Sequence, residues 1–88
     1  MIALYVLLCK NGRYYVGSTI NIERRFKEHC TGRVKSTKNL RPLKLVYSQE
    51  YGTIKEARLA EYWLKRQKSR VLIEKIISTG SLDKDFQN

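Results

Sequence analysis

The residues best suited to chemistry lie in a short stretch of the first third of this 88-residue chain. Tyr15 lies in a short strand-like stretch, residues 14–18. Arg25 and His29 follow and are four residues apart, which places them on one face of a helix. Ile22 and Phe26 repeat at the same spacing and form an apolar stripe beside that face. The sequence therefore predicts that a tyrosine, an arginine and a histidine line one rim beside an apolar base.

Tyr5 and Glu61 are two further candidates, and each has an ordinary structural explanation. Tyr5 would stand on a strand next to Tyr15, where cross-strand aromatic packing is the simpler interpretation. Glu61 lies on the flank of the apolar stripe of a second helix, where a surface ion pair with Lys65 or Arg58 is the commonest fate of a glutamate. Spacing alone leaves both explanations open.

The elements that must position these side chains follow from hydrophobic patterns and turn residues. Residues 2–9 form a continuous apolar run, which predicts a strand buried on both faces. Asn11 and Gly12 predict a hairpin turn, and residues 13–18 return as an antiparallel strand. A helix over residues 22–31 follows. The hairpin thus places the two tyrosine-bearing strands side by side, directly before the helix.

The second half of the chain predicts one more strand and two more helices. Residues 43–48 alternate as in a strand with one buried face, formed by Leu43, Leu45 and Tyr47. Thr53 opens a capping box for a second helix, whose inward stripe is Ala57, Ala60 and Leu64. Residues 71–78 form a third helix.

Together these elements predict one α+β domain over residues 1–80 and a polar C-terminal tail over residues 81–88. The expected fold is a small, largely antiparallel three-stranded sheet flanked by three helices, in the order β-β-α-β-α-α.

The charge of the chain favours an anionic partner, with nucleic acid as the first candidate. Eighteen Lys and Arg face eight Asp and Glu, which gives a formal net charge of +10. Residues 32–44 form a loop without an acidic residue, for which phosphate contact is favoured over simple solvation. The candidate nucleic-acid-binding residues in this loop are Arg33, Lys35, Lys38, Arg41 and Lys44. A second basic run, residues 65–70, separates the two C-terminal helices.

Several classes of protein are disfavoured. The sequence has no run of 18 apolar residues and no signal peptide, so we expect no membrane partner. Cys9 and Cys30 lack the spacing of a zinc site, and we expect buried or half-buried free thiols in a reducing, cytoplasmic environment.

The order of these residues resembles the GIY-YIG nuclease domain, in its small stand-alone bacterial form. The first motif corresponds to Ala3-Leu4-Tyr5 and the second to Tyr15-Val16-Gly17. The resemblance implies catalytic roles for Tyr5, Tyr15, Arg25 and His29, and metal binding by Glu61. Ser18 stands where some relatives carry a lysine.

This resemblance implies an endonuclease that hydrolyses phosphodiester bonds in DNA with a single Mg²⁺ or Mn²⁺ ion. Single-stranded or branched DNA and low sequence specificity are expected, with RNA as a further substrate and no obligate protein partner. The general base stays open between Tyr5, Tyr15 and His29. The alternative is a non-catalytic, basic nucleic-acid-binding module on the same fold.

Overall fold

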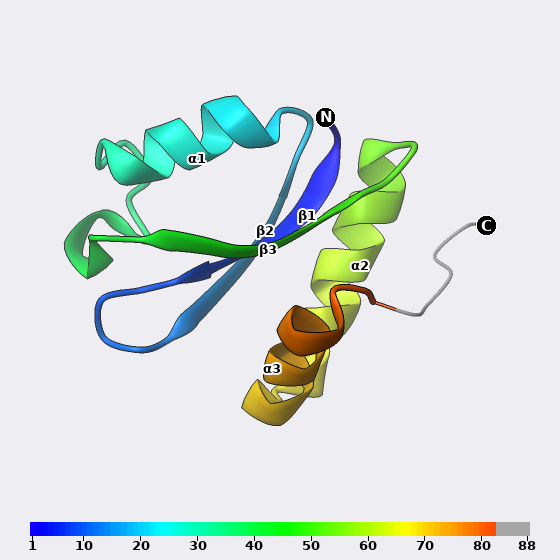
Figure 1. The fold of residues 1–88 in the computed structure, drawn as a ribbon. Coiled ribbons are helices and arrows are strands. Elements are labelled where there is room, and N and C mark those ends of the chain that lie inside the picture. The colour runs from blue at the N-terminus through cyan, green and yellow to red at the C-terminus, as the bar shows by residue number, and fades with distance from the viewer. Residues whose placement is uncertain (83–88) are drawn as a thin grey trace.

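An antiparallel sheet separates one helix from two others in the computed structural model, which describes residues 1–82 (Figure 1). The strands are β1 (Ala3–Leu8), β2 (Tyr14–Thr19) and β3 (Lys44–Glu50), in the spatial order β2-β1-β3. The helices are α1 (Ile22–Cys30), α2 (Ile54–Gln67) and α3 (Arg70–Thr79), with a short 3₁₀ turn at Lys38–Leu40. Figure 1 shows α1 on one face of the sheet and α2 and α3 on the other. The predicted fold class and element order are confirmed.

The central strand β1 is buried on both faces, as its apolar run predicts. Leu4 and Val6 pack in the core beneath α2 and α3, whereas Tyr5 and Leu7 pack on the side of α1. Because successive side chains of a strand point to opposite faces, one continuous apolar run can supply two cores.

The prediction that β3 buries one face is wrong. Its register against β1 shifts between the pairs Val6–Tyr47 and Leu7–Leu45, which leaves one extra residue in β3. An extra residue moves the side chains that follow to the opposite face of a strand. Leu45 therefore packs on the α1 side, while Tyr47 packs beneath α2 and α3.

Local capping explains where the helices begin. The side chain of Asn21 accepts a hydrogen bond from the Arg24 amide at 3.1 Å and caps α1. Thr53 and Ser69 cap α2 and α3 in the same way. The inward stripe expected for α2 is confirmed, because Ala57, Ala60 and Leu64 are all buried.

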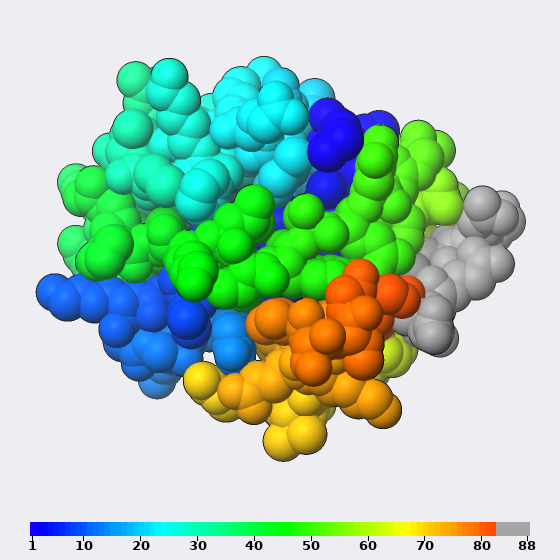
Figure 2. All heavy atoms as spheres, viewed as in Figure 1, coloured from blue at the N-terminus to red at the C-terminus, as the bar shows by residue number. Residues whose placement is uncertain are grey.

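The segment from residue 32 to residue 44 is more structured than the expected loop. Val34 and Thr37 are buried within it, and the 3₁₀ turn follows immediately. Figure 2 shows this segment packed against α1 and the end of β3. Two buried side chains therefore attach the basic loop to the domain.

The chain still contributes to the core after α3. Leu82 is buried beside Tyr47, and its amide donates a hydrogen bond to the Gln49 side chain at 2.9 Å. Residues 83–88 of the predicted tail lie outside the described residues. Cys9 is buried but Cys30 is exposed, which corrects the expectation for the second thiol. No helix within residues 1–82 is long and apolar enough to cross a membrane.

Candidate active site

The two candidate tyrosines lie side by side on the α1 face of the sheet. Tyr5 is opposite Gly17 in the antiparallel register, and Tyr15 is opposite Leu7, so the tyrosines form a diagonal pair. Their ring centroids are 6.3 Å apart. Tyr5 is almost fully buried, whereas Tyr15 is half-buried on the edge strand. Only Tyr15 is therefore positioned to meet a bound molecule directly.

His29 lies beneath both tyrosines and joins Tyr5 to Thr37. The Tyr5 hydroxyl is 2.9 Å from His29 Nε2, and His29 Nδ1 is 2.8 Å from the Thr37 hydroxyl. All three side chains are buried. A neutral imidazole has one donor and one acceptor nitrogen, so one hydroxyl donates to the ring and the other accepts from it. This buried chain of three residues could relay a proton.

Burial keeps both Tyr5 and His29 neutral at neutral pH. Desolvation raises the pKa of Tyr5 to about 12, and the Arg25 guanidinium opposes that rise. Desolvation lowers the pKa of His29 to about 4, and the positive charge of Arg25 adds to the effect. At neutral pH Tyr5 is therefore a neutral phenol, and His29 is a neutral imidazole of reduced basicity.

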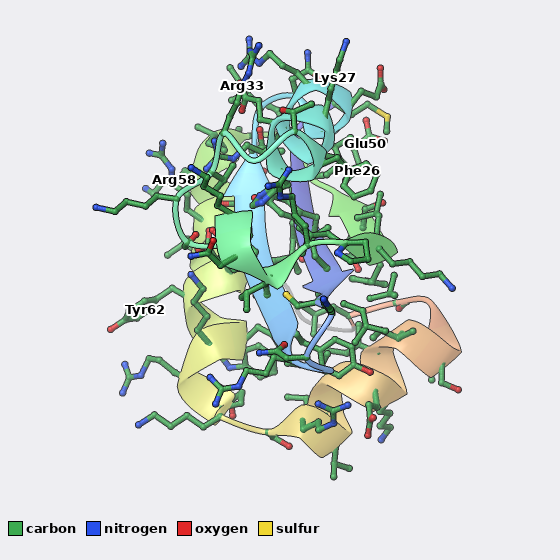
Figure 3. All side chains as sticks on the ribbon, turned by 90° about the vertical axis from the view of Figure 1, so that its left-hand side faces the viewer. Phe26, Lys27, Arg33, Glu50, Arg58 and Tyr62 are labelled. Carbon is green, nitrogen blue, oxygen red and sulfur yellow. The ribbon has the colours of Figure 1, made fainter. Side chains whose placement is uncertain are left out.

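Arg25 lies on α1 at the rim of an open cleft of about 270 Å³. Its guanidinium is 3.2 Å from Glu28, and the pair is partly exposed to solvent. Interaction with the Tyr5 phenol raises the pKa of Arg25. Arg24 and Arg58 line the same cleft, and Figure 3 shows Arg58 on the outer side of α2, at the periphery of the molecule. The cleft is thus lined by three arginines and one carboxylate, Glu28, which gives it a net positive charge.

Glu61 reaches the same region from α2. Its Oε1 accepts a hydrogen bond from the Ser18 hydroxyl at 2.5 Å, and its Oε2 lies 2.6 Å from Lys65 Nζ. Of the two ordinary ion pairs that spacing left open for Glu61, with Lys65 or with Arg58, the structure has the pair with Lys65. The bond to Ser18, 43 residues away, is a tertiary contact that fixes the carboxylate against β2.

Lys65 connects the acidic and aromatic parts of the site. Its ammonium is bonded to Glu61 and lies 6.0 Å from the centroid of the Tyr15 ring. Glu61 also acts on Tyr5, since its negative charge contributes to the raised pKa of that phenol. Ring contacts, the Lys65 bridge and the charges that act on Tyr5 thus link Tyr5, Tyr15, Arg25, His29 and Glu61. Figure 1 shows α1 and α2 on opposite faces of the sheet that carries the two tyrosines.

Glu61 is a single carboxylate whose two oxygens already have protein partners, Ser18 and Lys65. No group of three or more His, Cys, Asp or Glu side chains that could bind a metal occurs within residues 1–82. One carboxylate is enough for Mg²⁺ when water and a substrate phosphate supply the other oxygens. Lys65 already neutralises Glu61, so a metal ion would have to compete with that ammonium.

The five basic loop residues are exposed, but they are not equivalent. Arg33, Lys35, Lys38 and Lys44 extend from the surface. Arg41 donates from Nε to the Lys38 carbonyl at 2.9 Å and lies close to Gly32, so it also supports the loop.

Four contributors were not predicted from the sequence. Thr37 and Ser18 are polar residues in ordinary positions, and only the fold brings them to His29 and Glu61. Lys65 was expected as a surface partner, not as a neighbour of Tyr15. Arg58 was weighed only as a partner for Glu61, although helical spacing already placed it one turn away. Its shared cleft with Arg25 depends on how α2 crosses the sheet.

Comparison with known proteins assigns the chain to a family of nucleases. The model of the GIY-YIG catalytic domain matches residues 1–75, so the chain belongs to the GIY-YIG family. The chain is 38% identical over 78 residues to the UPF0213 protein of Limosilactobacillus reuteri, with 81% of each chain covered. It is also 38% identical over 74 residues to the UPF0213 protein YazA of Bacillus subtilis, covering 80% of this chain and 75% of YazA.

A solved structure agrees with this assignment. The solution NMR structure of the UPF0213 protein BH0048 from Bacillus halodurans superposes with a TM-score of 0.59 at 34% sequence identity. The match covers 91% of this chain and 86% of BH0048. The structural comparison therefore agrees with the UPF0213 relatives that the sequence comparison found.

Proposed function

We propose that this chain is a cytoplasmic endonuclease that uses a single Mg²⁺ or Mn²⁺ ion to hydrolyse phosphodiester bonds in DNA. The observation that carries the proposal is the position of Lys65, which bonds to Glu61 and lies 6.0 Å from the Tyr15 ring centroid. It places a carboxylate from α2 beside the tyrosines of the sheet, with Arg25 on the opposite helix. A guanidinium can stabilise the charge that develops on a phosphate, and a carboxylate can hold a divalent ion, so these groups are compatible with phosphodiester hydrolysis.

In the proposed reaction, the oxygen of a water molecule bonds to phosphorus as the ester P–O bond breaks. The water releases one proton to solvent, and the leaving oxygen takes one proton from solvent. The Arg25 guanidinium donates hydrogen bonds to the non-bridging oxygens, where negative charge increases in the transition state. Glu61 would hold the divalent ion, which neutralises the phosphate and the leaving oxygen when bound.

We assign contact with the attacking water to Tyr15. Tyr5 is 1% exposed and His29 is 0% exposed, whereas Tyr15 is half-buried at the edge of the sheet. Behind Tyr15, the Tyr5–His29–Thr37 chain positions the ring, because the Tyr15 and His29 ring centroids are 5.1 Å apart.

Basic residues on two sides of the site support DNA as the substrate. The cleft of Arg24, Arg25 and Arg58 faces one side, and the exposed loop cations lie beyond the end of α1. Phosphate contacts of this kind position a strand without reading its sequence. We therefore propose low sequence specificity, with single-stranded or branched DNA as the preferred substrate and RNA as a further one.

A second candidate function has one specific observation in its favour. Both oxygens of Glu61 already have partners, Ser18 and Lys65, so the carboxylate is satisfied without a metal ion. A basic domain that binds a strand without cutting it would have this arrangement. Cleavage therefore decides between the two functions, and binding does not.

The test is a panel of labelled single-stranded, duplex and branched DNA, together with RNA, incubated with Mg²⁺ or Mn²⁺. Metal-dependent cleavage of at least one substrate is expected. Arg25→Ala should lower the rate by about 10²–10³ because one charge-stabilising donor is lost. Lys27→Ala is the matched control, since Lys27 lies on the outer face of α1 (Figure 3). Binding to the whole panel without any cleavage would favour the second function.

A further inference from the structure

A second cavity, of about 390 Å³, adjoins the candidate active site. We name it the hairpin cavity, because the β1–β2 hairpin forms one wall and the junction of α2 and α3 forms the other. Its polar and aromatic lining consists of Arg13, Tyr14 and Tyr15 from the hairpin and Lys65, Lys68 and Arg70 from the junction. Figure 1 shows the hairpin and α3 on the same side of the molecule. The volume falls in the range of about 300–1,000 Å³ that is typical of ligand sites.

The charged residues that line the hairpin cavity are all positive. Four cations line it, and none of the described lining residues is acidic. Lys65 and Arg70 have carboxylate partners, Glu61 and Glu74. Arg13 and Lys68 have no ion pair with any residue in the described part of the chain. Two cations are therefore available at the wall for an anion from outside the protein.

One wall of the cavity is held rigid before any ligand arrives. The Arg70 guanidinium lies 4.7 Å from the centroid of the Tyr14 ring and donates a hydrogen bond to the Gly12 carbonyl at 2.6 Å. This pair ties the start of α3 to the hairpin. The floor is apolar, since Val16 and Leu64 are both buried and both line the cavity. A planar apolar group could rest on this floor while the cations hold its charged group.

The hairpin cavity is continuous with the candidate active site through two shared residues. Tyr15 and Lys65 line the cavity and also belong to the tyrosine–glutamate cluster. A strand whose phosphate lies at Arg25 and Glu61 would therefore pass directly into the cavity on one side.

From this placement we infer that the hairpin cavity binds the nucleotide next to the cleaved phosphodiester in a single-stranded nucleic acid. The phosphate is held by Arg13 and Lys68, and the base rests against the apolar floor at the edge of β2, which carries Tyr14 and Tyr15. A base can enter only if it is unstacked, so a continuous duplex is excluded from this cavity. The inference rests on the proposed function for the identity of the neighbouring site, and it names single-stranded substrate as the preferred class.

The test removes the two cations that lack acidic partners. Arg13→Gln with Lys68→Gln forms the cavity variant, and Lys10→Gln with Lys75→Gln forms a control of equal charge at exposed positions outside the cavity. Affinity for a labelled single-stranded oligothymidylate of about ten nucleotides is measured by fluorescence anisotropy against salt, with EDTA present. Loss of the one phosphate contact that Arg13 and Lys68 share should reduce the log–log salt slope by about 0.7 for a single strand. The control should keep the parent slope.

A blunt duplex of the same length is the second probe. We expect the cavity variant and the control to bind the duplex equally, because the duplex does not enter the cavity. The inference is overturned if both variants lose the same affinity for the single strand, since general charge then explains the binding. It is also overturned if the cavity variant binds the single strand as the parent does.

These measurements separate the inference from the proposed function. Binding is recorded without metal, so it does not require cleavage. A cavity-dependent affinity in a chain that never cleaves would uphold the cavity and reject the nuclease. If the chain cleaves in the presence of metal but the cavity variant binds the single strand as tightly as the parent, the nuclease proposal is upheld and the cavity inference is rejected.

Discussion

The ring of Tyr5 occupies the space that a side chain at Gly17 would need. A Cβ placed on Gly17 would lie 2.5 Å from both the Tyr5 hydroxyl oxygen and the ring carbon that bears it. The two residues face each other across β1 and β2, so neither backbone can move away without disturbing the ladder. The glycine of the second family motif is therefore required by the tyrosine of the first.

Gly17→Ala should consequently displace Tyr5 from His29. We expect the free energy of unfolding to fall by about 1–3 kcal/mol, as for other overpacked core positions, and cleavage to fall with it. Chemical denaturation and an initial-rate assay measure the two effects. Gly52→Ala is the matched control, because Gly52 is exposed and its nearest neighbour is the end of the Glu56 side chain. If Gly17→Ala is as stable and as active as the parent protein, Tyr5 and Gly17 are not packed in this way.

The buried imidazole of His29 should make the domain less stable in weak acid. Burial lowers the pKa of His29 from 6.5 to about 4. Between pH 6.5 and pH 4, His29 is therefore protonated in the unfolded chain and neutral in the folded chain. The contribution to stability is complete above pH 6.5 and is lost progressively as the pH falls toward 4. Its size is on the order of 3 kcal/mol.

Urea denaturation across this pH range measures the effect. His29→Gln is the comparison, because it has no group that titrates there and should give a flatter profile. Equal slopes for the parent and His29→Gln would show that His29 does not set the acid limit of stability.

Thr37 should act as a positioning residue for His29. Thr37→Val removes the partner of His29 Nδ1 while it keeps the side-chain volume, so a buried ring nitrogen is left unsatisfied. We expect a loss of about 1–3 kcal/mol in stability. Cleavage should decrease and its pH profile should shift, because the imidazole loses the hydrogen bond that sets its tautomer.

Thr37→Ser separates positioning from packing. Serine keeps the hydroxyl and loses only a methyl group, so it should restore the parent pH profile even if some stability is lost. If Thr37→Val and Thr37→Ser share one pH profile, the hydroxyl has no part in the reaction.

The elements of the fold could be predicted because their signals are local. The apolar run of β1, the Asn21 cap and the Thr53 capping box each determine a nearby stretch of backbone. The extra residue in β3 could not be predicted, since Leu45 and Tyr47 are both apolar and only pairing with β1 assigns their faces. Register is a property of two strands, and a single strand does not specify it.

The residues of the candidate site also fall into those that local spacing could predict and those that required the fold. Arg25 and His29 share a helix, so their spacing alone places them together. The contacts of Ser18 with Glu61 and of Thr37 with His29 link different elements, and their residue types are too common to signal a role. Sequence patterns therefore indicated the reacting groups, whereas the residues that hold those groups required the fold.

Glu61 and Lys65 provide the clearest test of metal binding. Lys65 Nζ lies 2.6 Å from Glu61 Oε2, so it occupies the position that a divalent ion needs. Glu61→Gln should abolish most cleavage at any Mg²⁺ concentration, because no other acidic residue of the described chain contacts Ser18 or Lys65. If Glu61 serves only as the ion-pair partner of Lys65, Glu61→Gln should change the free energy of unfolding by less than about 1 kcal/mol. Metal-free DNA binding should hold or strengthen, since a negative charge near the phosphate is lost.

Lys65→Gln tests the competition directly. Without the ammonium, Glu61 should bind the ion more tightly, and the Mg²⁺ concentration for half-maximal rate should fall severalfold. A titration of initial rate against Mg²⁺ for the parent, each single variant and the double variant measures this effect on one substrate. The double variant should behave like Glu61→Gln, because Lys65 acts on the metal only through that carboxylate. Equal rates for the parent and Glu61→Gln across the titration would reject Glu61 as the metal ligand, and with it the single-metal mechanism.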